Sequence, residues 1–307
     1  MFRVNLPAKI FESKAVKEVR RRVHDAIAEP GGILAVIGEV GIGKTIAVLS
    51  VLGALEEYGE HIIWCQQPEK ERLRIGGIMN TLVRHFGENP RRDMDARTEQ
   101  LRRLLGQAVS SGKKVVLVID EAHALHRQTM RALKRILELN FARRMGLLSI
   151  ILIAQPEIYE KLNRIEEVSL RTDILQMKPL TRNEAIEFMQ FIAQWSKLKV
   201  KDDVFGYLAT RCDIPLRLVV TLDRLNEISR TIDKPITRDI VNQYFVYPTK
   251  KRLEESGLSL RQAAEKAGIS PAAASLALQG KYKGDVQGVI SDLENAIKGV
   301  SPVRVLK

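Results

Sequence analysis

Apolar residues in the first 180 positions alternate between short continuous runs and longer helical patterns. Five runs have the length and β-branched content of buried strands; they lie at residues 33–37, 61–65, 115–119, 147–154 and 174–177. Helical patterns between them predict helices at residues 13–29, 46–55, 70–86, 95–110 and 127–140. Strands that alternate with helices in this way predict a mostly parallel sheet with helices on both faces.

From Thr181 onward the pattern becomes entirely helical. Thr181 and Glu184 form a capping-box signature that opens a helix running to about Trp195. Further helices are predicted near residues 202–211, 215–229 and 236–245, and Tyr247-Pro248-Thr249 begins a linker. The remaining segment, residues 251–299, reads as a separate module with short helices at 260–267 and 271–278.

A phosphate-binding loop follows the first predicted strand. A glycine-rich turn between a strand and a helix aims backbone N–H groups and a helix N-terminus at one point, which suits a nucleotide polyphosphate. In such a loop the lysine reaches the β- and γ-phosphates, and the hydroxyl residue after it binds Mg²⁺. The sequence therefore predicts an ATP and Mg²⁺ site made by Gly38, Glu39, Val40, Gly41, Ile42, Gly43, Lys44 and Thr45.

The second half of a nucleotide site follows the strand at residues 115–119, which ends in Asp120-Glu121. We expect this strand to lie beside the strand of the loop, so that Asp120 completes the Mg²⁺ shell with Thr45. Glu121 is placed to polarise the attacking water. His123 completes a helicase-like Asp-Glu-Ala-His tetrapeptide, but we interpret it as incidental, because 307 residues leave little room for a second motor domain.

Gln155 follows the strand at residues 147–154. A polar amide at the tip of the strand next to the acid-bearing one can donate a hydrogen bond to the γ-phosphate or to the lytic water. This position at the strand tip resembles that of the first sensor residue of AAA+ ATPases, and that resemblance implies the sensor role for Gln155. Simple capping of the next helix is the competing interpretation.

The chain has 307 residues with a formal net charge of +12 and a pI near 9.7. Such a charge favours binding to polyanions, of which nucleic acid is the commonest in a cytoplasm, although a soluble basic protein is the alternative. Two distant cysteines, Cys65 and Cys212, fit a reducing compartment. With no apolar run of eighteen residues and no signal-peptide core, we expect a cytoplasmic protein with no membrane span.

The C-terminal module matches a helix-turn-helix, because Gly268 supplies the turn and Pro271 occupies the first position of the second helix. That helix would enter the major groove of duplex DNA with few side chains able to make bidentate base contacts, which predicts weak sequence selectivity. A small protein-interaction domain is the alternative. The DNA-facing candidates are Ser270, Ala272, Ala273, Ser275 and Gln279, with Lys281 and Lys283 for phosphates.

The residues from about Phe11 to Arg230 resemble the AAA+ regulators of DNA transposition, the family that includes phage Mu transposition protein B. The resemblance rests on residues 11–16, the loop at 38–45, residues 120–122 and Leu216-Arg217, together with residues 268–285 of the C-terminal module. In the phage protein the module precedes the ATPase, whereas here it follows it. The resemblance implies an ATPase that assembles into filaments on duplex DNA with little sequence preference and recruits and activates a transposase.

The family also implies two arginine roles. An arginine before the fifth strand reaches the nucleotide of a neighbouring subunit, for which Arg171 is the first candidate and Arg164 the second. A second sensor opens a helix of the lid, where Arg217 fits, although many members have a glycine before the proline and the arginine directly after it. Basic residues along the inner surface would contact DNA phosphates. For any single residue of this set, a solvated surface position is the simpler interpretation. The candidates are Lys70, Arg72, Arg74, Arg131, Lys134 and Arg135.

The expected fold is an α/β AAA+ P-loop ATPase with a parallel sheet flanked by helices, a small helical lid and a C-terminal all-α domain. The predicted divisions are 1–30 for the N-terminal segment and helix, 31–180 for the ATPase core, 181–246 for the lid and 251–300 for the helix-turn-helix. Two other functions share these parts. One is a replication initiator or helicase loader, and the other is a secretion- or signalling-associated ATPase whose C-terminal module binds protein.

Overall fold

A computed structural model of the chain describes residues 10–65, 73–241, 249–250, 253–254, 256–279, 282 and 284–298. These residues fall into two units. The first comprises the described residues up to Leu180 together with Ile214–Leu216, and the second comprises residues 181–213 and those from Arg217 onward. Each unit has its own core, so each is described separately below.

The first unit is built on a five-stranded parallel sheet in the order β2-β3-β4-β1-β5. The sequence predicted all five strands, and a parallel sheet is what their alternation with helices requires. Every residue of β1, β3 and β4 is buried, which explains why these strands read as unbroken apolar runs. The strands are β1 (Ile33–Ile37), β2 (His61–Trp64), β3 (Val115–Ile119), β4 (Ser149–Ala154) and β5 (Thr172–Gln176).

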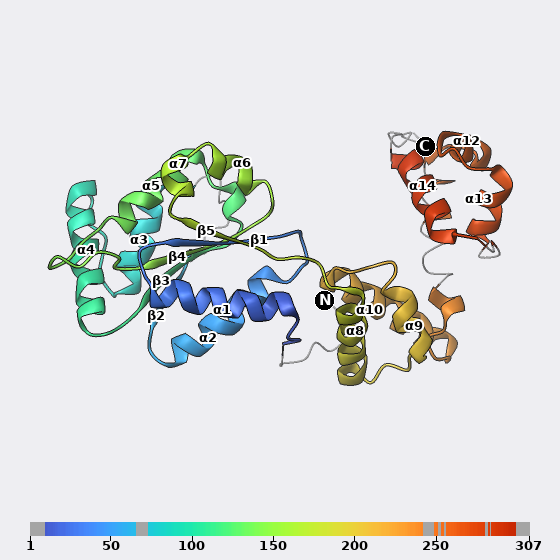
Figure 1. Cartoon of the computed structure of the whole chain (residues 1–307), viewed down its shortest axis with the longest axis horizontal. Helices are drawn as coiled ribbons and strands as arrows, with labels where there is room; N and C mark the ends of the chain where they lie inside the picture. The colour runs from blue at the N-terminus through green and yellow to red at the C-terminus, as the bar shows by residue number, and fades with distance from the viewer. Residues whose placement is uncertain are drawn as a thin grey trace. The chain divides into compact units, whose positions relative to one another are not determined.

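Helices cover both faces of this sheet (Figure 1). Leu34 and Val36 of β1 point to a core shared with the first two helices, whereas Ile33, Ala35 and Ile37 point to a core shared with the later ones. This division follows from the alternation of side chains along a strand. The helices of the first unit are α1 (Lys14–Ala28), α2 (Lys44–Glu57), α3 (Ile75–His85), α4 (Met94–Ser110), α5 (Arg127–Leu137), α6 (Ile158–Asn163) and α7 (Glu166–Ser169).

The ends of these helices follow local capping chemistry. The Ser13 side chain accepts a hydrogen bond from the Val16 backbone N–H at 3.2 Å and begins α1, as predicted. Helix α5 ends at Leu137, three residues earlier than predicted, because residues 141–144 turn back in a hairpin-like bridge. The short helices α6 and α7 were not predicted. None of the described helices carries a stretch long and apolar enough to cross a bilayer.

The second unit is helical, as predicted. Its first helices are α8 (Arg182–Ser196), α9 (Asp202–Leu208) and α10 (Pro215–Ile232), whose first two residues belong to the first unit. The predicted capping box at α8 is confirmed, since Thr181 and Glu184 exchange side-chain and backbone hydrogen bonds. Of the helix predicted at 236–245, residues 238–241 are helical and those beyond 241 lie outside the described residues.

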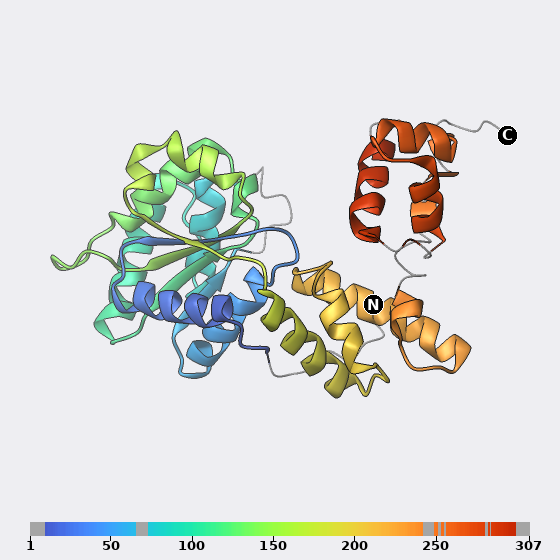
Figure 2. The ribbon, with the colours of Figure 1, turned by 45° about the vertical axis from the view of Figure 1, so that its right-hand side comes forward.

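The C-terminal module contains α12 (Leu260–Lys266), α13 (Pro271–Leu278) and α14 (Val286–Lys298), the last of which was not predicted (Figure 2). Its small core is dominated by alanines: Ala263, Ala264, Ala274 and Ala277 are buried against Leu293 and its neighbours. Short side chains let the helices approach closely. A turn with Gly268 at φ +67° joins α12 to α13, so the two predicted helices and their glycine turn are present.

Candidate nucleotide site

The predicted phosphate-binding loop lies between the carboxyl end of β1 and the amino end of α2. Gly41 and Gly43 have φ values of +81° and +100°, a region that favours glycine. Gly38 serves a different purpose, because a Cβ atom there would lie 2.9 Å from the Met177 carbonyl oxygen just after β5. The loop is therefore shaped by two left-handed glycines and held against the sheet by a third.

Lys44 is the first residue of α2 and is 7% exposed. Its ammonium donates hydrogen bonds to the carbonyl oxygens of Gly38 and Glu39, both at 2.8 Å, so it lies over the loop. Burial lowers the pKa of the Lys44 amine, and the carboxylates of Glu121 and Asp120 oppose that shift. A buried cation inside a ring of backbone groups is the arrangement that a polyphosphate requires.

Thr45 and Asp120 are brought together from two motifs 75 residues apart. The Thr45 hydroxyl donates a hydrogen bond to Asp120 Oδ2 at 3.0 Å. The expected reason was wrong, however, because β3 is not adjacent to β1; β4 lies between them. Val48 of α2 belongs to the same core as Ile62 of β2 and Val116 of β3, so α2 covers the face of the sheet that β3 also lines, and β3 ends in Asp120.

Glu121 has a strained backbone and two side-chain partners. Its φ and ψ of 54° and 36° place a non-glycine residue in the left-handed region, where strain is frequently associated with function. The Gln155 amide nitrogen lies 3.3 Å from Glu121 Oε2, and His123 Nε2 lies 3.4 Å from the same oxygen. The predicted base and the predicted sensor are therefore in contact, from the ends of β3 and β4.

His123, which the sequence interpretation set aside as incidental, belongs to this cluster. The Gln155 backbone N–H donates to His123 Nδ1 at 3.4 Å, so in the neutral imidazole the proton is on Nε2, facing Glu121. The His123 and Leu125 carbonyl oxygens both accept hydrogen bonds from the Lys161 ammonium. His123 therefore connects the tip of β4 to the carboxylate of Glu121. The helicase-like tetrapeptide was the signal that could have identified it.

The oxygen pair of Thr45 and Asp120 fits a Mg²⁺ ion. Mg²⁺ is bound in nucleotide sites through one or two protein oxygens, with phosphates and waters completing an octahedron. A hydroxyl and a carboxylate at 3.0 Å supply those oxygens. Among the described residues no group of three or more His, Cys, Asp or Glu side chains forms a metal cage. The site suits an ion that arrives with a nucleotide.

Arg171 directly precedes β5, at the amino end of the strands, whereas the phosphate loop lies at their carboxyl end. Its backbone carbonyl accepts a hydrogen bond from the N–H of Ile33, the first residue of β1, whereas the loop follows the last residue of β1. Its guanidinium donates to Glu138 Oε1 at 3.0 Å and to the Glu167 carbonyl at 3.1 Å. Arg171 thus faces away from the loop of its own chain. Arg164, the second candidate, is exposed at the end of α6.

The start of α10 contacts the loop through Leu216, a residue that belongs to the sequence resemblance but for which the sequence predicted no contact. The Leu216 N–H donates to the Gly41 carbonyl at 3.1 Å, and a Cβ atom on Gly41 would lie 2.7 Å from Leu216 Cβ. The prediction that residues 213–218 open a helix is confirmed, since α10 begins at Pro215. Arg217 belongs to the second unit, and its role as a second sensor stays a prediction.

Some of the proposed DNA contacts can be located. Arg131, Lys134 and Arg135 lie on one face of α5, at the spacing that brings helical residues together. Arg131 and Arg135 are exposed, but the Lys134 ammonium is 2.7 Å from a Glu167 carboxylate oxygen. Arg74 is exposed at the start of α3. Lys70 and Arg72 lie outside the described residues, so their predicted DNA contacts remain predictions.

Helix α13 presents an uncharged surface. Ser270 caps it by accepting a hydrogen bond from the Ala273 N–H at 3.1 Å, Ala272 and Gln279 are exposed, and the Gln279 amide donates to Ser275 Oγ at 3.1 Å. These are the side chains predicted to face the major groove. The two lysines predicted to contact phosphates, Lys281 and Lys283, are outside the described residues.

The family described as AAA domain matches residues 27–162 of the chain. The search of curated proteins found no match to the sequence of this chain. Among solved structures, the Cdc6p protein of Pyrobaculum aerophilum is similar with a TM-score of 0.62 at 13% identity, covering 98% of this chain and 84% of that one. The ORC2 protein of Aeropyrum pernix has a TM-score of 0.58 at 14% identity with the same coverages. The Walker-type ATPase PABY2304 of Pyrococcus abyssi has a TM-score of 0.53 at 16% identity, covering 97% and 93%.

The matched family segment begins in α1 and ends in α6, so it contains the loop, Asp120, Glu121 and Gln155. The structural similarities extend over nearly the whole chain. Because the sequence identities to these structures are below 20%, the similarity shows the fold only. Together with the sheet order and the loop geometry, they show that the chain has the AAA+ P-loop α/β fold.

Proposed function

We propose that the chain binds ATP with Mg²⁺ and hydrolyses it. The observation that carries this proposal is the 3.0 Å contact between Thr45 of the phosphate loop and Asp120 of β3, which joins the two halves of a nucleotide site. The Mg²⁺ ion, when bound, would neutralise charge on the β- and γ-phosphates. The match to the AAA domain and the ADP and ADPNP complexes of the similar ORC2 protein support nucleotide binding.

The side chains divide the work of hydrolysis. Lys44 exchanges its loop carbonyls for phosphate oxygens and stabilises the charge that builds on them. Glu121 accepts the proton of the attacking water, a role that contributes about 10²–10⁴-fold in rate. Gln155 holds Glu121 from the tip of β4 and can donate to the γ-phosphate or to the water.

Two substitutions separate binding from hydrolysis. Lys44→Ala should abolish ATP binding, whereas Lys17→Ala, an exposed lysine of α1, should leave it unchanged. Glu121→Gln should bind ATP normally and hydrolyse it at least about 10²-fold more slowly. Titration calorimetry and phosphate release measure the two steps. Normal ATP affinity in Lys44→Ala would reject the site.

We propose further that ATP binding controls attachment to duplex DNA, as in replication initiators. The similar ORC and Cdc6 chains align over 98% of this chain, so their similarity includes both units. In this chain the small helical module follows the AAA domain, whereas in the phage transposition protein it precedes the ATPase. The net charge of +12 supplies the attraction to phosphates.

Regulation of transposition is the second candidate. The sequence resemblance at residues 11–16 and 268–285 favours it, and the uncharged surface of α13 agrees with weak sequence selectivity. The order of the modules counts against it. A secretion- or signalling-associated ATPase, the third interpretation, predicts no salt-sensitive affinity for DNA.

A selection from random duplexes distinguishes these functions. An initiator enriches one sequence in the presence of ATP, whereas a transposition regulator enriches none and stimulates strand transfer by a transposase into the DNA it covers. Electron microscopy with and without ATP then shows whether the complexes are filaments. DNA affinity that does not fall between 50 and 200 mM salt would exclude both functions, since phosphate contacts release counterions.

The position of Arg171 supports a role in trans. It lies at the amino end of the strands, opposite to its own phosphate loop, so it can complete a nucleotide site only in a second copy of the chain. To do so it must leave Glu138. A head-to-tail contact of this kind forms a helical filament if it does not close into a ring.

Mixed assemblies test this role directly. Arg171→Ala and Lys44→Ala should each lack activity alone, the first for want of the finger and the second for want of bound nucleotide. Mixing them should restore hydrolysis, because Lys44→Ala subunits still offer Arg171 to their neighbours. Arg164→Ala is the matched control and should hydrolyse ATP at the normal rate. Inactivity of every mixture would reject Arg171 as the finger.

A further inference from the structure

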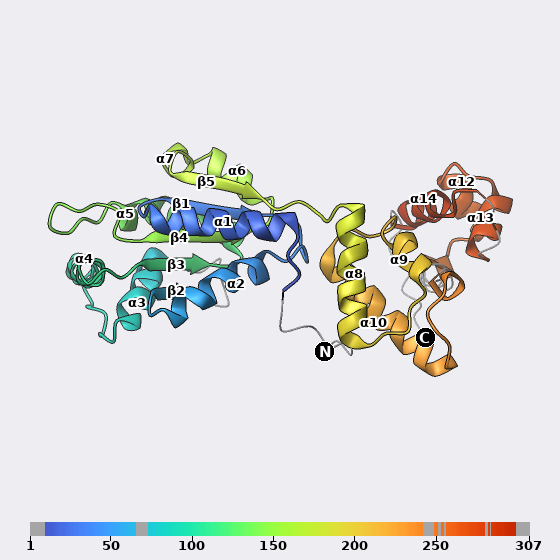
Figure 3. The same ribbon diagram turned by 60° about the horizontal axis from the view of Figure 1, so that its bottom comes forward.

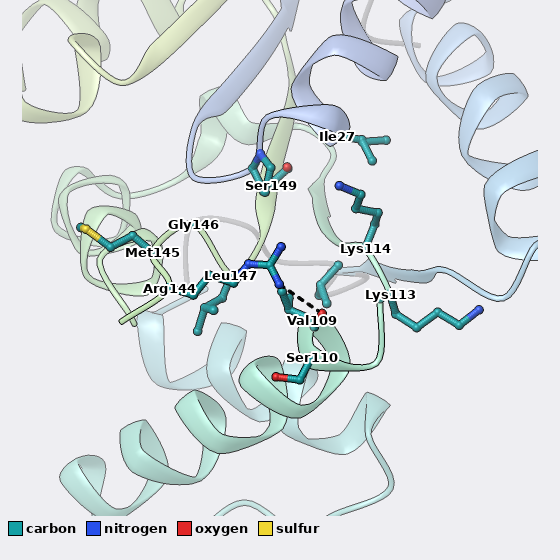
Figure 4. A pocket seen from close by; sticks show the side chains of 13 residues that line it. Ile27, Val109, Ser110, Lys113, Lys114, Arg144, Met145, Gly146, Leu147 and Ser149 are labelled. Carbon is teal, nitrogen blue, oxygen red and sulfur yellow. Dashed lines mark hydrogen bonds between the residues drawn. The ribbon is translucent and has the colours of Figure 1, made fainter. Parts of the chain in front are cut away.

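A hollow of about 440 Å³ lies at the amino ends of the central strands, at the opposite end of the sheet from the phosphate loop (Figure 4). It falls within the size range of ligand pockets. The ends of α1 and α4, the starts of β3 and β4, and the loop before β4 form its walls. Its lining residues are Ile27, Pro30, Val109, Ser110, Gly112, Lys113, Lys114, Val115, Arg144, Met145, Gly146, Leu147 and Ser149.

One wall of the hollow is a hairpin fixed to the body of the unit. The segment between α5 and β4 extends away from the sheet (Figures 1 and 3), and Phe141 and Arg144 pair within it. The Phe141 ring lies so close to Gly106 of α4 that a Cβ atom there would be 2.1 Å from it. Ala142 and Arg143 have φ values of 48° and 64°. Two strained residues persist only where packing holds them.

A second wall of the hollow forms where the loop before β1 contacts the loop before β4. Gly31 has φ +108° and Gly146 has φ +67°, and a Cβ atom on Gly146 would lie 2.5 Å from the Pro30 carbonyl oxygen. The loops before β1 and β4 therefore touch through glycine backbone. The hollow is bounded by two constrained loops, so its shape is set before any ligand arrives.

The charge of the lining has one sign. It contains Lys113, Lys114 and Arg144, and the lining that the structure describes includes no Asp or Glu. Two dibasic runs of the sequence, 113–114 and 143–144, thus meet at one place. Lys113 turns away and donates to the Tyr58 carbonyl at 3.2 Å (Figure 4). Lys114 extends toward Ile27, and within the described part of the chain no hydrogen bond or ion pair engages its ammonium.

The partial negative charges at two helix C-termini neutralise only part of this positive charge. The C-termini of α1 and α4 both point here, and each carries roughly half a negative charge. Ser149 Oγ already donates to the Ala26 carbonyl at 2.6 Å, and Arg144 lies 3.5 Å from the Val109 carbonyl. Lys114 and Arg144 together bring two positive charges against about one negative from the helix ends, and Lys113 offsets the nearby Glu60 carboxylate, which accepts a hydrogen bond from the Lys114 backbone N–H. A net attraction for an anion remains.

The same hollow also has some apolar surface. Ile27 and Leu147 are buried behind its wall, whereas Val109 is half-buried and Met145 is 70% exposed. A convex duplex could reach only the rim and would gain nothing from these side chains. A peptide that carries a carboxylate next to an apolar residue uses both features. The combination favours a protein ligand over nucleic acid.

We propose that this hollow binds an acidic segment of a partner protein, with its carboxylates on Lys114 and Arg144 and an adjacent apolar side chain against Val109 and Met145. The site requires no nucleotide and is separate from the phosphate loop of its own chain. It gives the chain a second binding site, whose specificity depends on charge and apolar contact.

Peptide display on the whole chain tests the proposal. Random hexapeptides selected on the wild-type protein should be enriched in Asp or Glu beside an apolar residue. Lys114→Glu should raise the Kd of the selected peptides at least tenfold in fluorescence anisotropy. Arg144→Gln, a milder change, should raise it several-fold. Arg84→Glu, an exposed arginine at the end of α3, is the matched charge reversal and should change nothing.

Folding and DNA binding are checked in the same variants. Unchanged ATP affinity and melting temperature in Lys114→Glu would show an intact first unit. Two results would overturn the proposal: selected peptides without acidic enrichment, or acidic peptides that bind Lys114→Glu as tightly as the wild type. If no acidic peptide is selected and Lys114→Glu loses affinity for a 20-base-pair duplex, the hollow contacts DNA and the proposal is wrong.

Discussion

The contact between Thr45 and Asp120 carries the proposed ATPase function, and a double-mutant cycle measures it. Thr45→Val removes the hydroxyl and keeps the shape, and Asp120→Ala removes the acceptor. A hydrogen bond to a buried charged group stabilises a protein by about 1.5–3 kcal/mol. This bond is only partly buried, at 3.0 Å, so we expect a coupling of about 1 kcal/mol without ligand.

Denaturant unfolding of the wild type, both single variants and the double variant gives the coupling. A loss of about 1 kcal/mol corresponds to a fall in melting temperature of roughly 2–4 °C for a unit of this size. Asp120 Oδ1 also accepts a hydrogen bond from the Glu121 N–H at 2.8 Å, but that bond is lost in both arms of the cycle and cancels. Thr98→Val, which removes a hydroxyl bonded within α4, is the control.

The functional readout is the dependence of nucleotide affinity on Mg²⁺. Thr45→Val should weaken ATP binding about tenfold or more in Mg²⁺ and leave binding in a chelator unchanged, because the hydroxyl acts through the ion. A coupling below about 0.3 kcal/mol together with wild-type dependence on Mg²⁺ would refute the reasoning. Thr45 and Asp120 would then be neighbours without a shared ligand.

Three further substitutions test other parts of the structure. His123→Ala should lower the single-turnover rate constant of hydrolysis about tenfold with little change in ATP affinity, because Glu121 loses one of its two partners. An unchanged rate constant would return His123 to an incidental role. Gly146→Ala should cost more than 2 kcal/mol in unfolding experiments, whereas Gly112→Ala, at a similar φ in open space, should cost only about 1 kcal/mol; equal losses would contradict the close approach of the two loops. Ser259→Ala should destabilise the C-terminal module by about 1 kcal/mol, seen as faster hydrogen exchange in α12.

The parts of the nucleotide site that could be predicted are those that a few consecutive residues encode. The loop from Gly38 to Thr45 carries its own geometry, because two glycines supply the left-handed turns and the flanking apolar runs form the strand and the helix. Asp120 and Glu121 could be placed because the end of a buried strand limits where they can lie. Short-range constraints were sufficient for these residues.

Long-range pairing could not be predicted in the same way. Nothing in the apolar run at 149–154 shows that β4 inserts between β1 and β3, since all three strands are equally buried and equally apolar. The link from His123 to Gln155 depends on that insertion, which places the two residues at neighbouring strand tips. The hairpin at 141–144 was missed for another reason, because Ala142 and Arg143 adopt positive φ values that their residue types disfavour.

The two proposals for the first unit concern the same end of its sheet, the amino ends of the strands. The Arg171 carbonyl oxygen accepts a hydrogen bond from the N–H of Ile33 at the start of β1, and a Cβ atom on Gly32 would lie 3.7 Å from the same oxygen. Gly32 is two residues after Pro30, which lines the hollow. If Arg171 completes the nucleotide site of a neighbouring copy, that copy must approach the same end of the sheet. A partner peptide in the hollow then competes with assembly for space.

This competition has a measurable consequence that neither proposal gives alone. A selected acidic peptide should reduce ATP-dependent assembly on DNA in wild-type protein, and Lys114→Glu should assemble equally with and without the peptide. ATP affinity should stay constant, because the phosphate loop is at the opposite end of the sheet. A peptide that binds without affecting assembly would separate the two sites and leave both proposals to stand independently. A peptide that lowers ATP affinity would contradict the separation of the hollow from the loop.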